Sequence, residues 1–174
     1  MSRAKHGSTL LRVGFGTDLH RLVEGNGLWI GGVLIPCPFS SEAVSDGDVL
    51  LHALVDALLG ASGLGDIGEW FPESSVKPGQ ASAAFVDAVM EKLRERSVEI
   101  VNVDATVDLQ NVRLAEWKPA IRENVASLLG IDSARVNVKA KTAERLGPIG
   151  EGVAIAAQAV VLLDGFGEER RVCE

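Results

Sequence analysis

One segment constrains the fold of this chain more than any other, the sequence SDGDVLLHALVDALLGASGLGD at residues 45–66. Nearly every position in it is apolar, and a helix that is apolar on all sides must be buried in a protein core. Asp48 or Ser45 can cap the start of this helix, and Gly60 or Gly63 can end it. We therefore expect the fold to be built around a buried helix.

Three ionisable residues interrupt the helical part of this segment, namely Asp48, His52 and Asp56. They stand four apart, so they share one stripe of the helix surface. His52 lies at the centre of the stripe. Asp48 or Asp56, one turn away, could fix the tautomer of its imidazole by a hydrogen bond.

The rest of the chain alternates between strand and helix patterns. In residues 10–16, Leu11, Val13 and Phe15 alternate with Arg12 and glycine, which is typical of a strand. Further strands are expected at 101–109, 135–141 and 153–163, with strand pairing within 28–36, helices at about 48–63, 81–96 and 119–129, and loops at 37–47 and 65–79.

This order of elements predicts an α/β fold of the α+β sandwich type. We expect a mixed four-stranded sheet with helices packed on one face and a small β-hairpin. At 174 residues the chain has the length of about one domain. We place that single domain at residues 11–163, between an N-terminal tail at 1–10 and a C-terminal tail at 164–174.

Composition excludes several classes of function. The net charge of -7 argues against binding to a nucleic-acid backbone, which needs a basic surface. Two cysteines, Cys37 and Cys173, form neither a disulfide framework nor a CxxC metal site, which favours a reducing cytoplasm. The longest apolar stretch, residues 153–163, is far shorter than the ~20 residues of a membrane span. We therefore expect a cytoplasmic protein without a nucleic-acid or membrane partner.

The motif TDLH at residues 17–20 raises the possibility of a metal site. Asp18 and His20 stand two apart in a strand and therefore point to one side, while Leu19 is expected to turn into the core. Together with His52 they offer one carboxylate and two imidazoles, a three-ligand set for zinc with a fourth position open. Alternatively, Asp18 caps a turn and His52 is a hydrogen-bonded core histidine. Spacing alone leaves both interpretations open.

A second polar cluster lies at residues 139–147, KAKTAERLG. Alternation places Lys139 and Lys141 on one face of a strand, and Thr142 and Glu144 follow in a turn. Taken alone, this pattern favours a solvated strand edge protected by lysines.

Four segments together resemble the 2-C-methyl-D-erythritol 2,4-cyclodiphosphate synthase family of the non-mevalonate isoprenoid pathway. They are GFGTDLHRL, IGGVLIP, SDGDVLLHALVDALLGASGLGDIGEWFPE and NVKAKTAERLGPIGEGVAIAAQAVVLL, in order from about Leu11 to Leu163. The resemblance implies a metal-dependent, cyclising phosphorus–oxygen lyase. Its substrate would be 4-diphosphocytidyl-2-C-methyl-D-erythritol 2-phosphate and its products the 2,4-cyclodiphosphate and CMP. It also implies a homotrimer whose active sites lie between neighbouring subunits.

The resemblance further implies a role for individual residues. Asp18, His20 and His52 would hold one Zn²⁺ per subunit, and Glu144 would bind a second ion, Mg²⁺ or Mn²⁺, at the diphosphate. The implied catalytic residues are Thr142, Glu144 and Ser45. Residues 66–68 would hold the erythritol hydroxyls, and residues 109–115 the cytidine. The full implied substrate-binding set is Asp18, Leu19, His20, Val44, Ser45, Asp66, Ile67, Gly68, Phe71, Pro72, Glu73, Leu109, Val112, Arg113, Leu114, Ala115, Lys141, Thr142, Ala143 and Glu144.

The chain departs from the family pattern in three places. Val44 replaces a histidine assigned to steadying the transition state, so we expect a reduced rate. The segment Asn111-Val112-Arg113-Leu114 keeps a cation but loses the usual proline. LGPIGEG is two residues short, with Pro148 in place of a phenylalanine and no arginine, so isoprenoid diphosphates should bind weakly or not at all at the trimer axis.

Two other functions stay open from the sequence. The chain could be a nucleotide-binding protein that has lost turnover through Val44, in which case activity should return in Val44→His. It could also be a metal-dependent phosphohydrolase, which would give a linear product.

Overall fold

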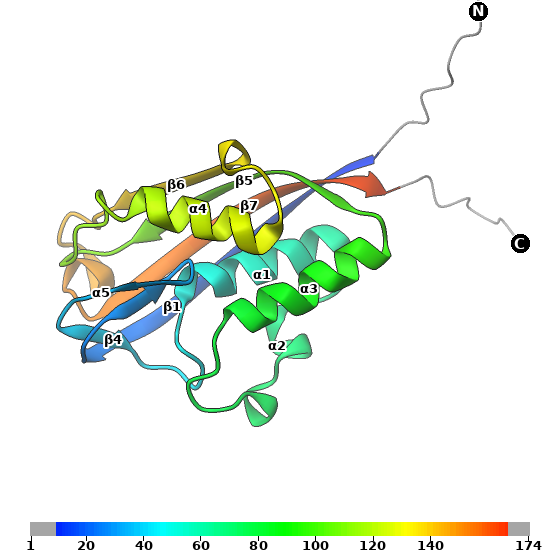
Figure 1. The fold of residues 1–174 in the computed structure, drawn as a ribbon. Coiled ribbons are helices and arrows are strands. Elements are labelled where there is room, and N and C mark those ends of the chain that lie inside the picture. Colours follow the sequence, from blue (N-terminus) through cyan, green and yellow to red (C-terminus); the bar gives the residue numbers. More distant parts are fainter. Residues whose placement is uncertain (1–9, 167–174) are drawn as a thin grey trace, which may run out of the picture.

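The structure is a computed structural model, and residues 10–166 are described here (Figure 1). The strands are β1 (Leu10–Glu24), β2 (Leu28–Ile30), β3 (Val33–Ile35), β4 (Phe39–Ser41), β5 (Glu99–Asp108), β6 (Val136–Lys141) and β7 (Ala154–Phe166). The helices are α1 (Val49–Ser62), α2 (Ile67–Trp70), α3 (Ala83–Glu95), α4 (Lys118–Leu129) and α5 (Gly147–Gly150), with 3-10 turns η1 (Glu73–Ser75) and η2 (Ser133–Arg135). β1 and β7 extend into the two predicted tails, which otherwise lie outside the described residues.

The main sheet has five strands in the order β4-β1-β7-β5-β6, and all neighbours are antiparallel except the parallel pair β5 and β6. The sheet is mixed, as predicted, but the predicted number of four strands is wrong. The additional strand is β4, which pairs with the end of the long strand β1. It has only three residues and lies in a segment rich in turn formers, so it carries no strand pattern of its own.

The predicted hairpin forms from β2 and β3. Gly31 and Gly32 connect the two strands with φ values of +60° and +75°, a conformation that glycine adopts without steric cost. Both backbone N–H groups donate to the carboxylate of Asp48, at 2.9 and 2.6 Å. The hairpin turn is therefore attached directly to the start of α1.

Helix α1 is the buried helix that the sequence predicts. The Asp48 side chain caps it by accepting from the N–H groups of Leu50 and Leu51, and Gly63 ends it with a φ of +64°. Helices α1, α3 and α4 all lie on one side of the main sheet, as predicted (Figure 1). The short helix α2 lies within the predicted loop at 65–79.

Strand β1 lies unusually close to α1 because two glycines face the helix. A Cβ atom on Gly14 would lie 1.9 Å from the carbonyl oxygen of Ala57, and one on Gly16 would lie 2.1 Å from that of Ala53. No larger residue fits at either position without moving the helix. Even-numbered residues of β1 therefore face α1.

Odd-numbered residues of β1 point to the opposite side of the sheet. Val13, Phe15 and Leu19 are 67%, 62% and 61% exposed, so the prediction that Leu19 turns into the core is wrong. A strand with apolar residues on one side and glycines on the other does not reveal which side a helix covers. Here the glycine side is covered, because only glycine permits the close approach of α1.

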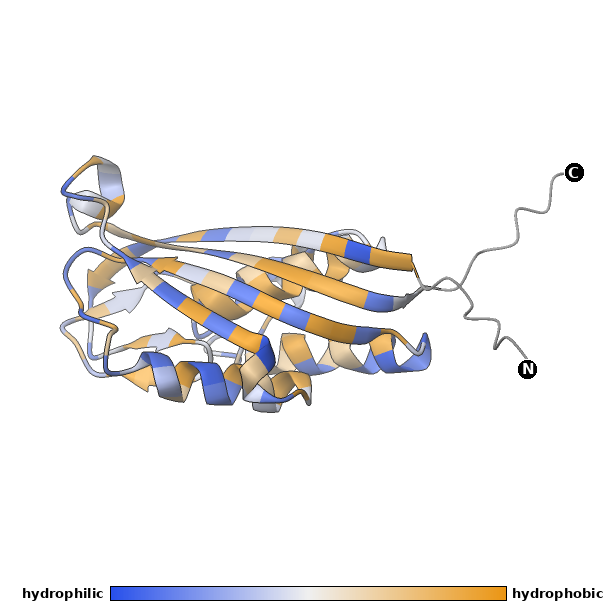
Figure 2. Ribbon diagram, turned by 90° about the horizontal axis from the view of Figure 1, so that it is seen from above, coloured by the Kyte–Doolittle hydropathy of each residue, from blue (hydrophilic) through white to orange (hydrophobic). Residues whose placement is uncertain are grey.

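We call the side of the sheet without helices the uncovered face; Figure 2 looks onto it. Its β1 and β7 half is largely apolar, since Val13 and Phe15 lie beside Leu162 and Val160. Its β5 and β6 half is polar and carries the ion pair between Asp104 and Lys139. An apolar patch of this kind on a sheet is typical of a surface that another chain covers.

In residues 10–166, no single helix is both long enough and apolar enough to cross a membrane. Val49–Ser62 and Ile67–Ser75 meet the length and composition criteria only as a pair, and that pair is bent by 97°.

Candidate metal centre and adjoining cavities

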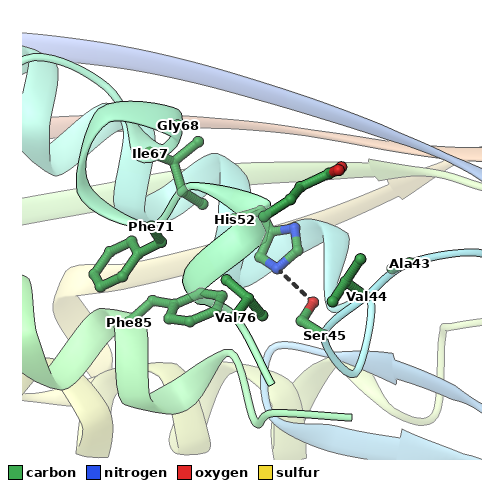
Figure 3. A pocket seen from close by; sticks show the side chains of 10 residues that line it. Ala43, Val44, Ser45, His52, Ile67, Gly68, Phe71, Val76 and Phe85 are labelled. Carbon is green, nitrogen blue, oxygen red and sulfur yellow. Dashed lines mark hydrogen bonds between the residues drawn. The ribbon is translucent and has the colours of Figure 1, made fainter. Parts of the chain in front are cut away.

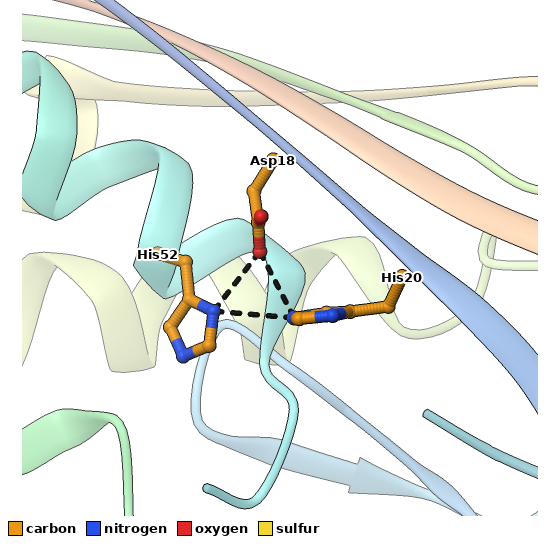
Figure 4. Close-up of side chains that lie close together, drawn as sticks. All are labelled: Asp18, His20 and His52. Carbon is orange, nitrogen blue, oxygen red and sulfur yellow. Dashed lines mark hydrogen bonds and ion pairs between the residues drawn. The ribbon is translucent and has the colours of Figure 1, made fainter. Parts of the chain in front are cut away.

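Asp18, His20 and His52 converge on one point, and we call these three residues the metal cluster (Figure 4). The Asp18 Oδ2 atom lies 3.0 Å from His20 Nε2 and 2.9 Å from His52 Nδ1. The two imidazole nitrogens are 3.2 Å apart. One carboxylate oxygen and two imidazole nitrogens are a donor set that suits zinc. The convergence of these side chains, which the spacing in TDLH left open and the family resemblance implies, is therefore present.

The local fold explains why the three side chains meet. Asp18 and His20 follow Gly14 and Gly16 on the α1 side of β1, at successive even positions. His52 lies in the first turn of α1 and faces the same strand. Because the glycines bring helix and strand together, donors from the two elements come within hydrogen-bond distance.

The cluster is electrostatically suited to a cation. Burial acts to raise the pKa of Asp18, but hydrogen bonds from His20 and His52, and the charge on these rings, hold that pKa well below its usual range. The Asp18 side chain is 24% exposed, and those of His20 and His52 are 15% and 11% exposed. An ionised carboxylate with limited access to water is a strong ligand for a divalent ion.

The second nitrogen of His52 has partners that the sequence did not predict. Its Nε2 atom lies 2.8 Å from Oγ of Ser82 and 3.2 Å from Oγ of Ser45. The expectation that Asp48 or Asp56 fixes the His52 tautomer is wrong. Asp48 caps α1, and Asp56 accepts from the backbone N–H of Ile67 at 3.2 Å. Ser82 precedes α3 and lies thirty residues from His52, so no helix periodicity connects them.

A cavity of about 220 Å³ opens beside His52 (Figure 3). Its lining includes six residues of the implied substrate-binding set, which are Val44, Ser45, Ile67, Gly68, Phe71 and Glu73. Ala43, Val76 and Phe85 also line it and were not predicted. The structure therefore brings these six predicted residues to one cavity next to the metal cluster, while their individual roles stay predictions.

The far wall of this cavity is aromatic. The rings of Phe71 and Phe85 stack at a centroid distance of 4.5 Å, and Phe85 also lies 5.9 Å from the His52 ring. Asp66 does not line the cavity; its side chain caps α2 by accepting from Glu69 N at 2.9 Å. Pro72 precedes the turn η1.

A second cavity, of about 400 Å³, lies where β5 and β6 end, toward the opposite edge of the sheet from β1. Its lining includes most of the predicted cytidine and diphosphate residues, which are Leu109, Val112, Arg113, Leu114, Ala115, Lys141 and Thr142, together with Gln110, Lys118 and Ala140. Thr142 donates to the Glu144 carboxylate at 2.7 Å. We call residues 109–115 and 141–144 the β6 edge.

The metal cluster and the β6 edge lie far apart within one chain. Asp18, Ala157, Val107 and Ala140 form one row across the sheet, and Thr142 follows Ala140 by two residues. Three strand spacings correspond to roughly 14 Å. Leu19, which the resemblance places at the substrate, points to the uncovered face and away from the cluster. Among residues 10–166, the metal cluster is the one group of three or more histidine, cysteine or acidic side chains arranged to hold an ion.

Comparison with known proteins shows which family this chain resembles along most of its length. The model of the YgbB family matches residues 11–164. The chain is 49% identical to the 2-C-methyl-D-erythritol 2,4-cyclodiphosphate synthase of Laribacter hongkongensis, covering 88% of this chain and 95% of that protein. It is 50% identical to the chloroplastic protein of the same name from Arabidopsis thaliana, over 87% of this chain. The match spans 66% of the length of that plant relative.

Solved structures of similar fold include the bifunctional IspDF protein of Campylobacter jejuni, with a TM-score of 0.87 and 40% identity. That match covers 92% of this chain and 44% of the bifunctional protein. A CDP-bound 2C-methyl-D-erythritol-2,4-cyclodiphosphate synthase matches with a TM-score of 0.81 and 37% identity, covering 88% of this chain and all of the other.

Proposed function

Because this chain belongs to the YgbB family, we propose that it is a 2-C-methyl-D-erythritol 2,4-cyclodiphosphate synthase. The reaction would convert 4-diphosphocytidyl-2-C-methyl-D-erythritol 2-phosphate to the 2,4-cyclodiphosphate with release of CMP. The observation that carries the proposal is the convergence of Asp18, His20 and His52 beside a cavity lined by predicted substrate residues. In this chemistry the enzyme is a lyase of isoprenoid precursor biosynthesis.

The chain's residues would mainly position the substrate. The 2-phosphate attacks the β-phosphorus, a new P–O bond closes the ring, and the bond between the β-phosphorus and the bridging oxygen breaks to release CMP. A phosphate monoester has a second pKa near 6, so the attacking group is mostly ionised at neutral pH and needs no general base. Orienting the 2-phosphate against the diphosphate supplies much of the rate enhancement.

Three residues fit a resident Zn²⁺, because Asp18, His20 and His52 present one oxygen and two nitrogens to one point. Glu144, with Thr142 donating to it, would contribute to a Mg²⁺ or Mn²⁺ held largely by the diphosphate itself. When bound, these ions would neutralise negative charge on the diphosphate.

We further propose that the protein is a homotrimer with active sites between subunits. One diphosphate cannot contact both the metal cluster and the β6 edge of a single chain when they are roughly 14 Å apart. A neighbouring copy that places its β6 edge against the cluster would complete the site, and such head-to-tail contacts close into rings. The apolar half of the uncovered face offers the buried contact area that this assembly needs.

The remaining expectations follow the same proposal. Ser45 would contact the substrate beside His52, residues 66–68 would bind the erythritol, and residues 109–115 would bind the cytidine. The predicted domain, residues 11–163, and the cytoplasmic location stay predictions.

The direct test supplies the diphosphocytidyl substrate with Zn²⁺ and Mg²⁺ and follows the products by ³¹P NMR. The expected result is CMP together with the cyclic diphosphate. A linear phosphate product would instead identify a phosphohydrolase. If zinc-loaded protein bound CDP but released neither product, the chain would be a binding protein, and Val44→His would then test whether the lost histidine is the reason.

A further inference from the structure

The His52 ring has two nitrogens, and only Nδ1 faces the metal cluster. The other nitrogen, Nε2, lies 2.8 Å from Oγ of Ser82. Ser82 has 0% exposure and stands immediately before α3. A fully buried hydroxyl in contact with a ligand imidazole must have a defined donor and acceptor role, because water cannot substitute for a partner.

The role of this hydroxyl is fixed by Asp46. The Ser82 hydroxyl donates to Asp46 Oδ1, and the Ser82 backbone N–H donates to Asp46 Oδ2 at 3.0 Å. A carboxylate only accepts hydrogen bonds, so the single hydroxyl proton of Ser82 is committed to Asp46. Oγ of Ser82 can then only accept from His52. In the metal-free cluster Asp18 Oδ2 competes for this proton, because it lies 2.9 Å from Nδ1. An acceptor at Nε2 draws the imidazole proton to that nitrogen and so frees the Nδ1 lone pair, which points toward Asp18 and His20, for a cation.

Ser45 is the competing partner of Nε2, but its geometry is weaker. Its Oγ lies 3.2 Å from Nε2 and also accepts from the backbone N–H of Gly47 at 3.1 Å. Asp46, in contrast, is fixed by its own loop, since Oδ1 accepts from the backbone N–H of Asp48 at 3.2 Å. The relay from Asp46 through Ser82 is thus the shorter and better anchored contact.

We propose that Asp46 and Ser82 form a positioning pair that selects the metal-binding tautomer of His52. The inference rests on the metal centre of the proposed function. Outer partners of a ligand histidine typically change metal affinity by roughly 10–100-fold. Neither residue belongs to the metal cluster, so both would act through His52.

The test measures the zinc affinity of the full chain by competition with a chromophoric chelator. Ser82→Ala should weaken zinc binding by roughly 10–100-fold, and Ser82→Thr, which keeps the hydroxyl, should restore most of it. Asp46→Asn should also weaken binding, because its amide can donate to Ser82 and turn the hydroxyl proton toward Nε2. Ser62→Ala is the matched control: Ser62 is a buried serine that donates to Leu58 O at 2.6 Å, and its loss should leave zinc affinity unchanged.

The tautomer of His52 can also be measured directly by NMR. Long-range ¹H–¹⁵N correlation spectra of the metal-free protein at alkaline pH should show a larger share of the His52 proton on Nε2 in the parent than in Ser82→Ala. Zinc affinity in Ser82→Ala and Asp46→Asn equal to that of a zinc-binding parent would overturn this inference alone. A parent that binds no zinc would overturn the metal centre of the proposed function as well.

Discussion

The metal cluster and the β6 edge differ in how much of a site one chain supplies. The cluster joins a strand and a helix that pack on each other through Gly14 and Gly16, and all three donors are largely buried. The β6 edge consists of a loop and a turn, and Thr142 and Glu144 there contact each other in solvent. The fold therefore completes the cluster within the chain, while in the proposed trimer the β6 edge would need a ligand and a neighbouring copy.

The largest effect is expected from substitutions in the metal cluster. His52→Ala or Asp18→Ala removes one of three donors, and zinc content should fall from about one per chain to near zero. Because charge neutralisation at the diphosphate is worth several kcal/mol, turnover should fall by about 10³-fold or more. Metal analysis and CMP release measure the two results. Unchanged zinc in either variant would contradict the assignment of the cluster.

The β6 edge should respond differently to the loss of a carboxylate. Glu144→Gln removes a charge but no member of the cluster, so turnover should fall by about 10²-fold while zinc content stays at the parent level. The same metal analysis, with Mg²⁺ varied in the activity assay, separates the two regions. A loss of zinc in Glu144→Gln would mean that the two regions form one metal site.

Substitution of Val44, beside the metal cluster, should change turnover by a smaller factor. Val44 lines the cavity beside His52 and stands where the family resemblance implies a histidine. Val44→His should raise turnover by about tenfold, below the 10²–10³-fold cost of losing a hydrogen-bond donor in an optimised site. Steady-state CMP release checks this value. A turnover equal to or below that of the parent would show that Val44 does not limit the rate.

The smallest effect is expected on stability, from the ion pair between Asp104 and Lys139 in the polar half of the uncovered face. The hydrogen bond from Lys139, opposed by partial burial and assisted by Asn137, lowers the pKa of Asp104. Its contribution to stability is therefore present above the ordinary aspartate pKa of about 3.9 and is lost as pH falls through the lowered value. Because both side chains are about 40% exposed, we expect less than about 1 kcal/mol. Urea unfolding at neutral and acidic pH measures the free energy of unfolding. As pH falls, this free energy should decrease less steeply in Asp104→Asn than in the parent, and an identical decrease would contradict the pairing.

The same contrast explains what the sequence could reveal. The apolar run of α1 predicted a buried helix, and the spacing of Asp18 and His20 predicted a shared direction, because both depend on local periodicity. The Asp48 cap and Gly63 end follow from residue type. These local features describe both elements that carry the cluster, β1 and α1, so the candidate metal centre was within reach of the sequence.

Features that depend on tertiary packing were not predictable in this way. The predicted direction of the Leu19 side chain was wrong, because the apolar side of β1 is the uncovered one. Helix α1 instead packs on the glycine-rich side. The predicted hydrogen-bond partners of His52 were wrong, because its partner Ser82 lies at the start of α3, thirty residues away in the sequence. Strand β4 forms because β1 extends past its neighbours and leaves backbone groups to pair.

The central claim is that each chain holds a complete metal cluster but only part of an active site. Mixing two inactive variants, His52→Ala and Glu144→Gln, through joint unfolding and refolding tests it most directly. Random assembly at equal amounts should give about one quarter of sites with an intact cluster from one chain and an intact β6 edge from its neighbour, and turnover should recover in that proportion. Mixed oligomers with no more activity than either variant alone would contradict a shared site.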